Sequence, residues 1–435
     1  MTWTDLTMPL PPSHPDRFVL ANEVHARPPE ALTAPVKITY LALFSDRSQR
    51  ETEWRRVVEF AKEHGASPPK PDVNHYSENF GSFRLKWERH AEFSRYKFMV
   101  QENGEAPFEQ PAIRSVPGDW VASIPGEVMA AAQVAIRPAD RTPLDHDLMS
   151  TNYFAGNSII GAVLSGGAAA GFTDFRIHED GFSRFLIEDR GTTPRQAGRL
   201  VQRILEIDTY RVMAMLALPV ARKLMPLLDT EECELTEISN ALVDCKDEEE
   251  PKLLDRLTQL QAKIESDNAE NHFRFSAAAA YYDLVQRRIV DLREERIQGL
   301  QTFHGFIDRR LAPAMNTCMA VRTRQENLSS HMARATQLLS TRVNIANERQ
   351  NQGILASMNR RALLQMRLQE TVEGLSIAAI TYYVVGLVSY LAKGAKASGL
   401  SLNVDLVTGI SIPIVLIIVA LGVRKIRKMV AADTT

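Results

Sequence analysis

The stretch VTGISIPIVLIIVALGVRKIRK, Val407–Lys428, decides the architecture of this chain. Its first seventeen residues carry no charge, and four of the five residues that follow Val423 are Arg or Lys. A helix needs about 20 mainly apolar residues to cross a hydrocarbon core of about 30 Å, and in lipid it must satisfy its own backbone hydrogen bonds. We therefore predict a transmembrane helix over 406–423 and a basic cytoplasmic tail over 424–435.

A second apolar segment lies upstream. GLSIAAITYYVVGLVSYLA, residues 374–392, has no charged residue and is long enough to span a membrane. The two spans, joined by an external loop over 393–405, predict a transmembrane hairpin. Lys and Arg flank its outer ends, and the loop has only Lys393 and Lys396, which places both termini in the cytoplasm. The alternative, two core helices of a soluble domain, is disfavoured because core helices rarely end in a cluster such as RKIRK.

Polar side chains mark one face of the first span. Ser376, Tyr383 and Tyr390 are spaced by seven residues and share a helical face. Such a stripe predicts a pore lining or an oligomer contact. The alternative is that Tyr390 lies at the membrane interface and that the other hydroxyls bond to their own backbone.

The rest of the chain predicts an α+β cytoplasmic domain followed by a long helical stalk and the C-terminal two-helix transmembrane hairpin. We expect a cytoplasmic α/β domain over 1–190, with a suggestion of two related halves. A helix plus acidic linker should follow over 191–250, and a long helical or coiled region over 251–373.

Local patterns predict individual elements. VKITYLALF (36–44) and FRLKWERHAEFSRYKFMV (83–100) predict strands, and IPGEVMAAAQVAI (124–136) predicts a helix. Thr193 and Pro194 predict the N-cap and first residue of a long helix. A helix break is expected at DNAENHFRF (267–275), and Pro313 should kink or end the next helix.

The most distinctive soluble stretch is HPDRFVLANEVHARPPE, residues 14–30. Its polar residues, which could bind a metal or an anion, are His14, Arg17, Glu23, His25 and Arg27. They lack HExxH spacing and a glycine loop, so we favour a hydrogen-bonded structural clasp and leave a metal site undecided.

Composition narrows the function classes. The net charge of −2 does not favour nucleic-acid binding, and the three cysteines form no CxxC pair. There is no GxGxxG, GxxxxGK[ST] or GxSxG pattern. We therefore predict no enzymatic activity and no cofactor. The predicted partners are the lipid bilayer, further copies of the same chain and a candidate metal cation.

The stretch HPDRFVLANEVHARP, the pairing of FRLKWERHAEF with FSRFLIEDRG, and the terminal hairpin together resemble an uncharacterised bacterial membrane-protein family, domain of unknown function 3422. The resemblance covers essentially the whole chain. It implies a bacterial membrane protein and supplies no activity or site residues. Our own prediction for its location is the inner (plasma) membrane.

In architecture the chain also looks like CorA-type two-span magnesium channels, which are pentameric with a Gly-Met-Asn signature where the first span exits. Here the exit is Ser389–Gly394, SYLAKG, so the signature is absent. The leading hypothesis is a CorA-like oligomeric ion channel or transporter of unknown selectivity. The alternative is a non-conducting membrane-anchored scaffold or sensor that binds a cytosolic partner. An unrecognised enzyme using the cluster from His14 to Arg27 is a third hypothesis.

Overall fold

The computed structural model forms two compact units, Met1–Ala241 with Arg256–Ala335 and Leu242–Asp255 with Thr336–Thr435. The residues that the structure describes are 11–25, 28–46, 48–71, 73–101, 106–139, 145–245, 249–398 and 403–432.

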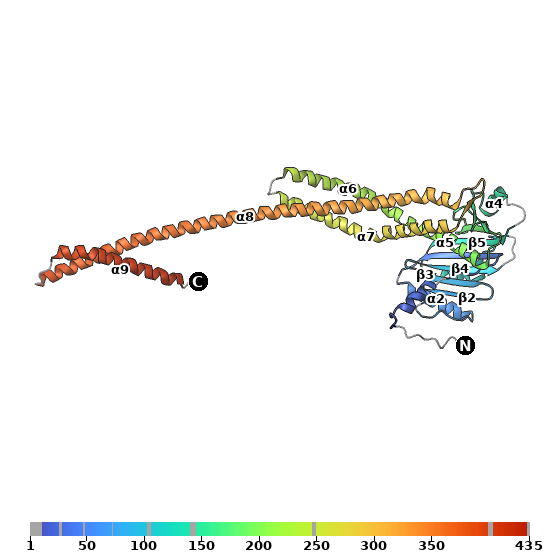
Figure 1. Ribbon diagram of the computed structural model, residues 1–435, viewed down its shortest axis with the longest axis horizontal. Helices are drawn as coiled ribbons and strands as arrows, with labels where there is room; N and C mark the ends of the chain where they lie inside the picture. The colour runs from blue at the N-terminus through green and yellow to red at the C-terminus, as the bar shows by residue number, and fades with distance from the viewer. Residues whose placement is uncertain are drawn as a thin grey trace. The chain divides into compact units, whose positions relative to one another are not determined.

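One mixed sheet forms the centre of the first unit (Figure 1). In the described residues it has nine strands in the order β2-β3-β4-β1-β5-β8-β7-β6-β9. Their bounds are β1 Val36–Phe44, β2 His75–Asn79, β3 Arg84–Arg89, β4 Phe93–Gln101, β5 Glu127–Pro138, β6 Ile160–Leu164, β7 Ala169–Thr173, β8 Ser183–Asp189 and β9 Glu295–Arg296.

The two halves of the sheet have matching strand orders but different directions. From the centre outward, β1, β4, β3 and β2 mirror β5, β8, β7 and β6. However, β1 pairs antiparallel with β4, whereas β5 pairs parallel with β8. The connection from β1 to β2 through α2 (Arg50–Glu63) therefore differs from the connection from β5 to β6 through α4 (His146–Tyr153). Both halves share one sheet, and their relatedness stays a prediction.

Helices cover both faces of the sheet. The helices before the long helical region are α1 Arg17–His25, α2 Arg50–Glu63, η2 Ala112–Ser115, α3 Gly118–Ala122, α4 His146–Tyr153 and α5 Pro194–Met215. On one face, Val57 and Phe60 of α2 pack with Leu85, Trp87 and Phe98 of the sheet in a continuous buried cluster.

Helix α5 covers the opposite face, and its start follows the sequence closely. The Thr193 hydroxyl accepts from the Gln196 amide, the Gln196 side chain accepts from the Thr193 amide, and Pro194 is the first helical residue. Further along, the Thr209 hydroxyl contacts the hydroxyl of Tyr40 on β1 at 2.8 Å. Tyr40 therefore lies on the face of β1 that packs against α5.

The predicted helix over 124–136 is wrong, because residues 127–138 form the central strand β5. The small apolar residues of this segment are compatible with either a helix or a strand by intrinsic propensity. Pairing with β1 on one side and β8 on the other decides it, since both neighbours supply backbone partners along most of its length.

The long helices follow as α6 Ala217–Asp244, α7 Glu250–Asp291 and α8 Phe303–Ala397. In the first unit α6, α7 and the beginning of α8 lie side by side (Figure 1) and bury apolar residues such as Ile238, Leu260 and Met332. The expected break at 267–275 is wrong, because α7 continues through it, and α8 does not end at Pro313. Buried residues on both sides, including Ile264, Phe275, Leu311 and Met315, hold the helices there.

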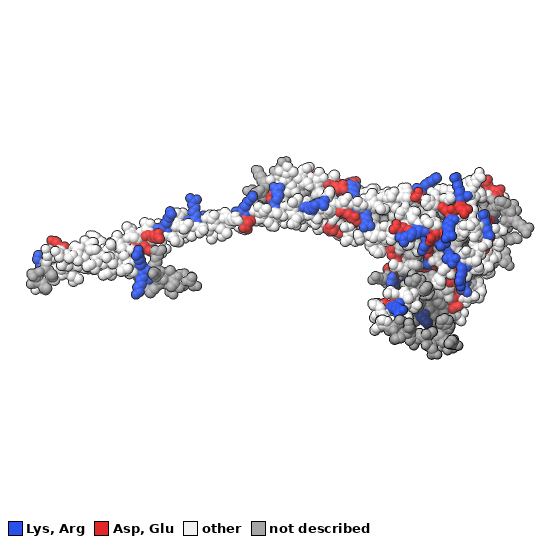
Figure 2. Space-filling view, viewed as in Figure 1, with Lys and Arg blue, Asp and Glu red and all other residues white. Residues whose placement is uncertain are grey.

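The second unit contains the remainder of α8 and helix α9, Val404–Ala432. Both are long and apolar enough to cross a membrane. The most apolar 18-residue stretch is 11% buried in α8, and that of α9 is fully unburied. Figure 2 shows several charged side chains along the middle of α8 and a mostly uncharged stretch near its end. The predicted fold class is thus confirmed: an α+β domain, long helices and two C-terminal helices of spanning length.

Candidate functional site

The predicted polar face of the first span is exposed within this chain. Ser376 is exposed, and Tyr383 and Tyr390 are 71% and 75% exposed. By contrast, Thr381 and Ala392 of the same helix are buried. The three predicted residues therefore lie on a helical surface that is open to lipid or to another protein.

A groove of about 800 Å³ runs between α8 and α9. Tyr383 and Tyr390 line it and Ser376 does not, so the structure brings together only two of the three residues. Lys393 lies at the Tyr390 end, with its ammonium 5.8 Å from the centre of the tyrosine ring. The other lining residues are Ala378, Thr381, Tyr382, Val385, Gly386, Leu387, Ser389, Thr408, Ile412 and Leu416.

The N-terminal polar cluster is described only in part. The His14 ring Nδ1 accepts from the Asp16 amide at 3.2 Å, and the Arg17 guanidinium donates to the Ser13 hydroxyl at 3.0 Å. These contacts are local and exposed. Arg27 and the side chains of Glu23 and His25 lie outside the described residues, so the proposed clasp or ligand role of this cluster stays a prediction.

Pro28 and Glu30, which follow that cluster in the sequence, are hydrogen-bonded to the sheet. Glu30 accepts hydrogen bonds from Arg84 at 3.1 Å and from Ser77 at 2.8 Å, and the Pro28 carbonyl accepts from Lys86. The same backbone crosses α5 so closely that a Cβ on Gly198 would lie 1.7 Å from the Glu30 carbonyl oxygen. Only glycine leaves room for this crossing.

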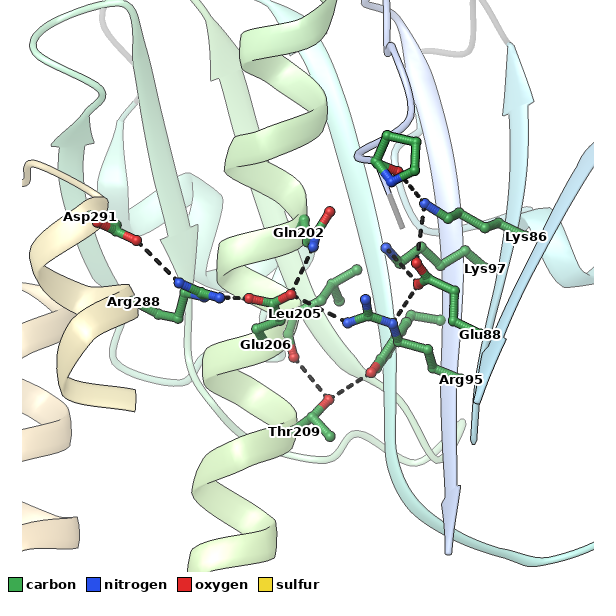
Figure 3. A network of polar contacts seen from close by, with 12 residues as sticks. Lys86, Glu88, Arg95, Lys97, Gln202, Leu205, Glu206, Thr209, Arg288 and Asp291 are labelled. Atoms are coloured by element: carbon green, nitrogen blue, oxygen red, sulfur yellow. Dashed lines mark hydrogen bonds and ion pairs between the residues drawn. The ribbon is translucent and has the colours of Figure 1, made fainter. Parts of the chain in front are cut away.

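A set of buried charged side chains lies between the sheet and α5 (Figure 3). We name it the buried charge cluster, and its members, all 5% exposed or less, are Lys86, Glu88, Arg95, Lys97 and Glu206. Lys86 and Glu88 alternate along β3 and face Lys97 and Arg95 of the neighbouring β4. The strand register therefore places Glu88 directly opposite Arg95 and Lys86 directly opposite Lys97, so Glu88 lies among three positive charges.

Arg95 links the two carboxylates of the cluster. Its Nε lies 2.5 Å from Glu88 Oε2, and its NH1 lies 3.4 Å from Glu206 Oε1. Glu88 also pairs with Lys86 at 3.2 Å and with Lys97 at 3.9 Å. The sheet and α5 are thus joined by a continuous chain of ion pairs.

The chain of contacts extends to α7. Glu206 accepts from Arg288 of α7 and from Gln202 of its own helix, the latter at 2.8 Å. Arg288 in turn contacts Asp291 at 3.3 Å. Strands β3 and β4, helix α5 and helix α7 therefore share one polar network, seen in Figure 3.

The cluster shifts the titration of its members. Burial opposes the ionisation of Glu88, but the charges of Arg95, Lys97 and Lys86 outweigh it and lower the pKa of Glu88 to about 2. For Lys97, burial and the repulsion of Arg95 exceed the attraction of Glu88 and lower the pKa to about 7. Glu206 stays ionised, because Arg95 and Arg288 overcome the effect of burial and lower its pKa.

This geometry suits a structural link more than a reaction centre. The members are too deeply buried to meet a substrate, and a buried ion pair is costly to break because the remaining charge loses its partner. In the part of the chain that the structure describes, no group of three or more His, Cys, Asp or Glu could hold a metal ion.

The sequence matches the family described as "Protein of unknown function (DUF3422)" over residues 12–430. This chain belongs to the DUF3422 family. The family prediction is therefore confirmed, and the DUF3422 match gives no support to the likeness with CorA-type channels. A search of curated proteins found no match.

Sequence reasoning about this DUF3422 protein missed the buried charge cluster. A signal was present, because Lys86 and Glu88 in FRLKWER, and Arg95 and Lys97 in FSRYKF, occupy alternate strand positions. Alternating charge normally indicates a solvated face. The partners that reverse this interpretation, Glu206 and the Pro28 carbonyl, come from distant parts of the chain.

Proposed function

We propose that this DUF3422 protein is a homo-oligomeric membrane protein that anchors its first unit at the cytoplasmic side of a bacterial inner membrane, as a non-conducting scaffold or sensor. The observation that carries the proposal is the pair of apolar, almost unburied helices in the second unit. Lipid is the solvent that such side chains require. Arg367 before the first span, and Arg424 and Lys425 after the second, support a cytoplasmic location for both ends.

Helix α8 supports self-association. Leu364, Leu368, Val372 and Leu375 follow one another at intervals of four, four and three residues and are 56–74% exposed. A row of exposed apolar residues at this spacing is typical of a helix–helix contact. Equivalent rows meet around a symmetry axis when copies of one chain associate, so a further copy is the partner that we propose.

Light scattering of the full-length protein in mild detergent tests the oligomer. Leu368→Glu should lower the protein mass of the particle, because it buries a charge in the proposed contact. Gln369→Glu, one position further along the same helix, should keep the wild-type mass. A monomeric wild type, or a Leu368→Glu variant of unchanged mass, would refute the contact.

Side-chain chemistry favours a scaffold over a channel. Cation pathways are commonly lined by rings of carboxylates or backbone carbonyls. Here the exposed polar face offers phenol groups, and the ammonium of Lys393 lies beside Tyr390. A positive charge at this end of the span repels cations.

Exposed apolar side chains on α1 support a partner surface for a scaffold. Phe18, Val19 and Leu20 are 63–69% exposed on this short helix of the first unit. Adjacent exposed apolar side chains of this size are typical of protein contact sites. They support a role in binding a cytosolic partner.

Ion conduction is the second candidate, and the exposure of Ser376, Tyr383 and Tyr390 on one face of α8 favours it. Flux assays in liposomes with Mg²⁺, Co²⁺, Ni²⁺, Na⁺ and K⁺ separate the two. The scaffold predicts silence with every ion. Ion flux that is lost in Tyr383→Leu but preserved in Tyr382→Leu would refute the scaffold and support a channel.

A further inference from the structure

The groove between α8 and α9 has an apolar floor. Ala378, Ile412 and Leu416 have apolar side chains, and a Cβ on Gly386 would meet no atom within 4 Å. The Thr381 and Thr408 hydroxyls donate to the Ile377 and Val404 carbonyls of their own helices, at 2.7 and 2.8 Å. Their hydrogen bonding is satisfied, so the floor presents an apolar surface to a ligand.

One end of the groove is polar and positively charged. Tyr390 and Lys393 line it there, and in the described residues no carboxylate pairs with the Lys393 ammonium. The lining residues of α8, 378–393, rise about 22 Å along the helix, which is close to half of a bilayer of about 40–45 Å with its headgroup regions. An apolar slot of one-leaflet length that ends at a cation matches the shape and charge of an anionic phospholipid.

We propose that this groove binds one anionic phospholipid, with an acyl chain between α8 and α9 and its phosphate at Lys393 and Tyr390. The inference rests on the proposed membrane location of the two helices. It adds a specific ligand to a segment that would otherwise serve only as an anchor.

Native mass spectrometry of the full-length protein tests the proposal, with phosphatidylglycerol or phosphatidylcholine added to protein purified from the membrane fraction. Gly386→Leu fills the groove and should weaken lipid retention at least about tenfold. Gly422→Leu is the matched control, because a Cβ there also meets nothing within 4 Å and the residue does not line the groove. It should retain lipid as the wild type does.

A second pair of variants tests the headgroup contact. Lys393→Gln should reduce the preference for phosphatidylglycerol over phosphatidylcholine about fivefold, and Lys396→Gln, which does not line the groove, should leave it unchanged. Equal lipid retention by Gly386→Leu and Gly422→Leu would overturn the proposal, as would an unchanged preference in Lys393→Gln. A Gly386→Leu variant that changes oligomer mass but not lipid retention would show that protein occupies the groove. Recovery of the wild type in the soluble fraction would instead refute the membrane location itself.

Discussion

Glu206→Gln tests whether the buried charge cluster holds the sheet to the helices. Glu206 pairs with Arg95 at 3.4 Å and accepts from Arg288. After the substitution the charge of Arg95 depends on Glu88 alone, which Lys86 and Lys97 already share. Removal of one partner from a buried pair costs about 3–5 kcal/mol. With an m-value of about 3 kcal/mol/M, the urea midpoint should fall by about 1 M or more.

Tryptophan fluorescence of the full-length protein in mild detergent measures this midpoint. Every tryptophan precedes residue 121, so the signal reports the sheet and not the spans. Glu326→Gln is the matched control, because Glu326 forms a partly exposed pair with Arg322 at 2.8 Å. Such a pair contributes about 0.5 kcal/mol or less. Equal midpoints for the two variants would refute the structural role of the cluster.

Two further predictions concern the same unit. Lys97 releases its proton near pH 7 in the folded chain and near pH 10 in the unfolded chain, so its contribution to the free energy of unfolding should rise by about 2 kcal/mol between pH 7 and 9. Urea titrations at both values should show this rise in the wild type and lack it in Lys97→Met; equal pH dependence would contradict the shifted pKa. Gly198→Ala should lower the thermal midpoint of the fluorescence transition, by about 1–3 kcal/mol of stability, because its methyl group collides with the Glu30 carbonyl. Gly353→Ala, in open space on α8, should leave that midpoint unchanged, and an unchanged midpoint in both variants would contradict the close crossing.

Sequence patterns predicted the elements whose signals are local. Thr193, Pro194 and Gln196 carry the whole start of α5 in four residues, and VKITYLALF has the β-branched and aromatic content of a buried strand. The two helices of spanning length could be predicted from apolar composition and length alone.

Elements that depend on distant neighbours could not be predicted in this way. The alanine-rich run of β5 is a strand because β1 and β8 pair with it, and neither neighbour adjoins it in the sequence. Pro313 does not end α8, since buried Leu311 and Met315 hold the helix on both sides. The buried charge cluster likewise depends on a strand register and on α5, about 110 residues beyond Arg95.

Cysteine labelling in intact cells tests the central claim, which is that the last part of the chain crosses the membrane twice from the cytoplasm. An Asn403→Cys substitution lies at the start of α9, in the connection between the spans, and Cys233 is a native, exposed cysteine of the first unit. A membrane-impermeant maleimide should label the cysteine at position 403 in intact cells and Cys233 only after permeabilisation. Labelling of Cys233 in intact cells, or protection of position 403 until permeabilisation, would contradict the account.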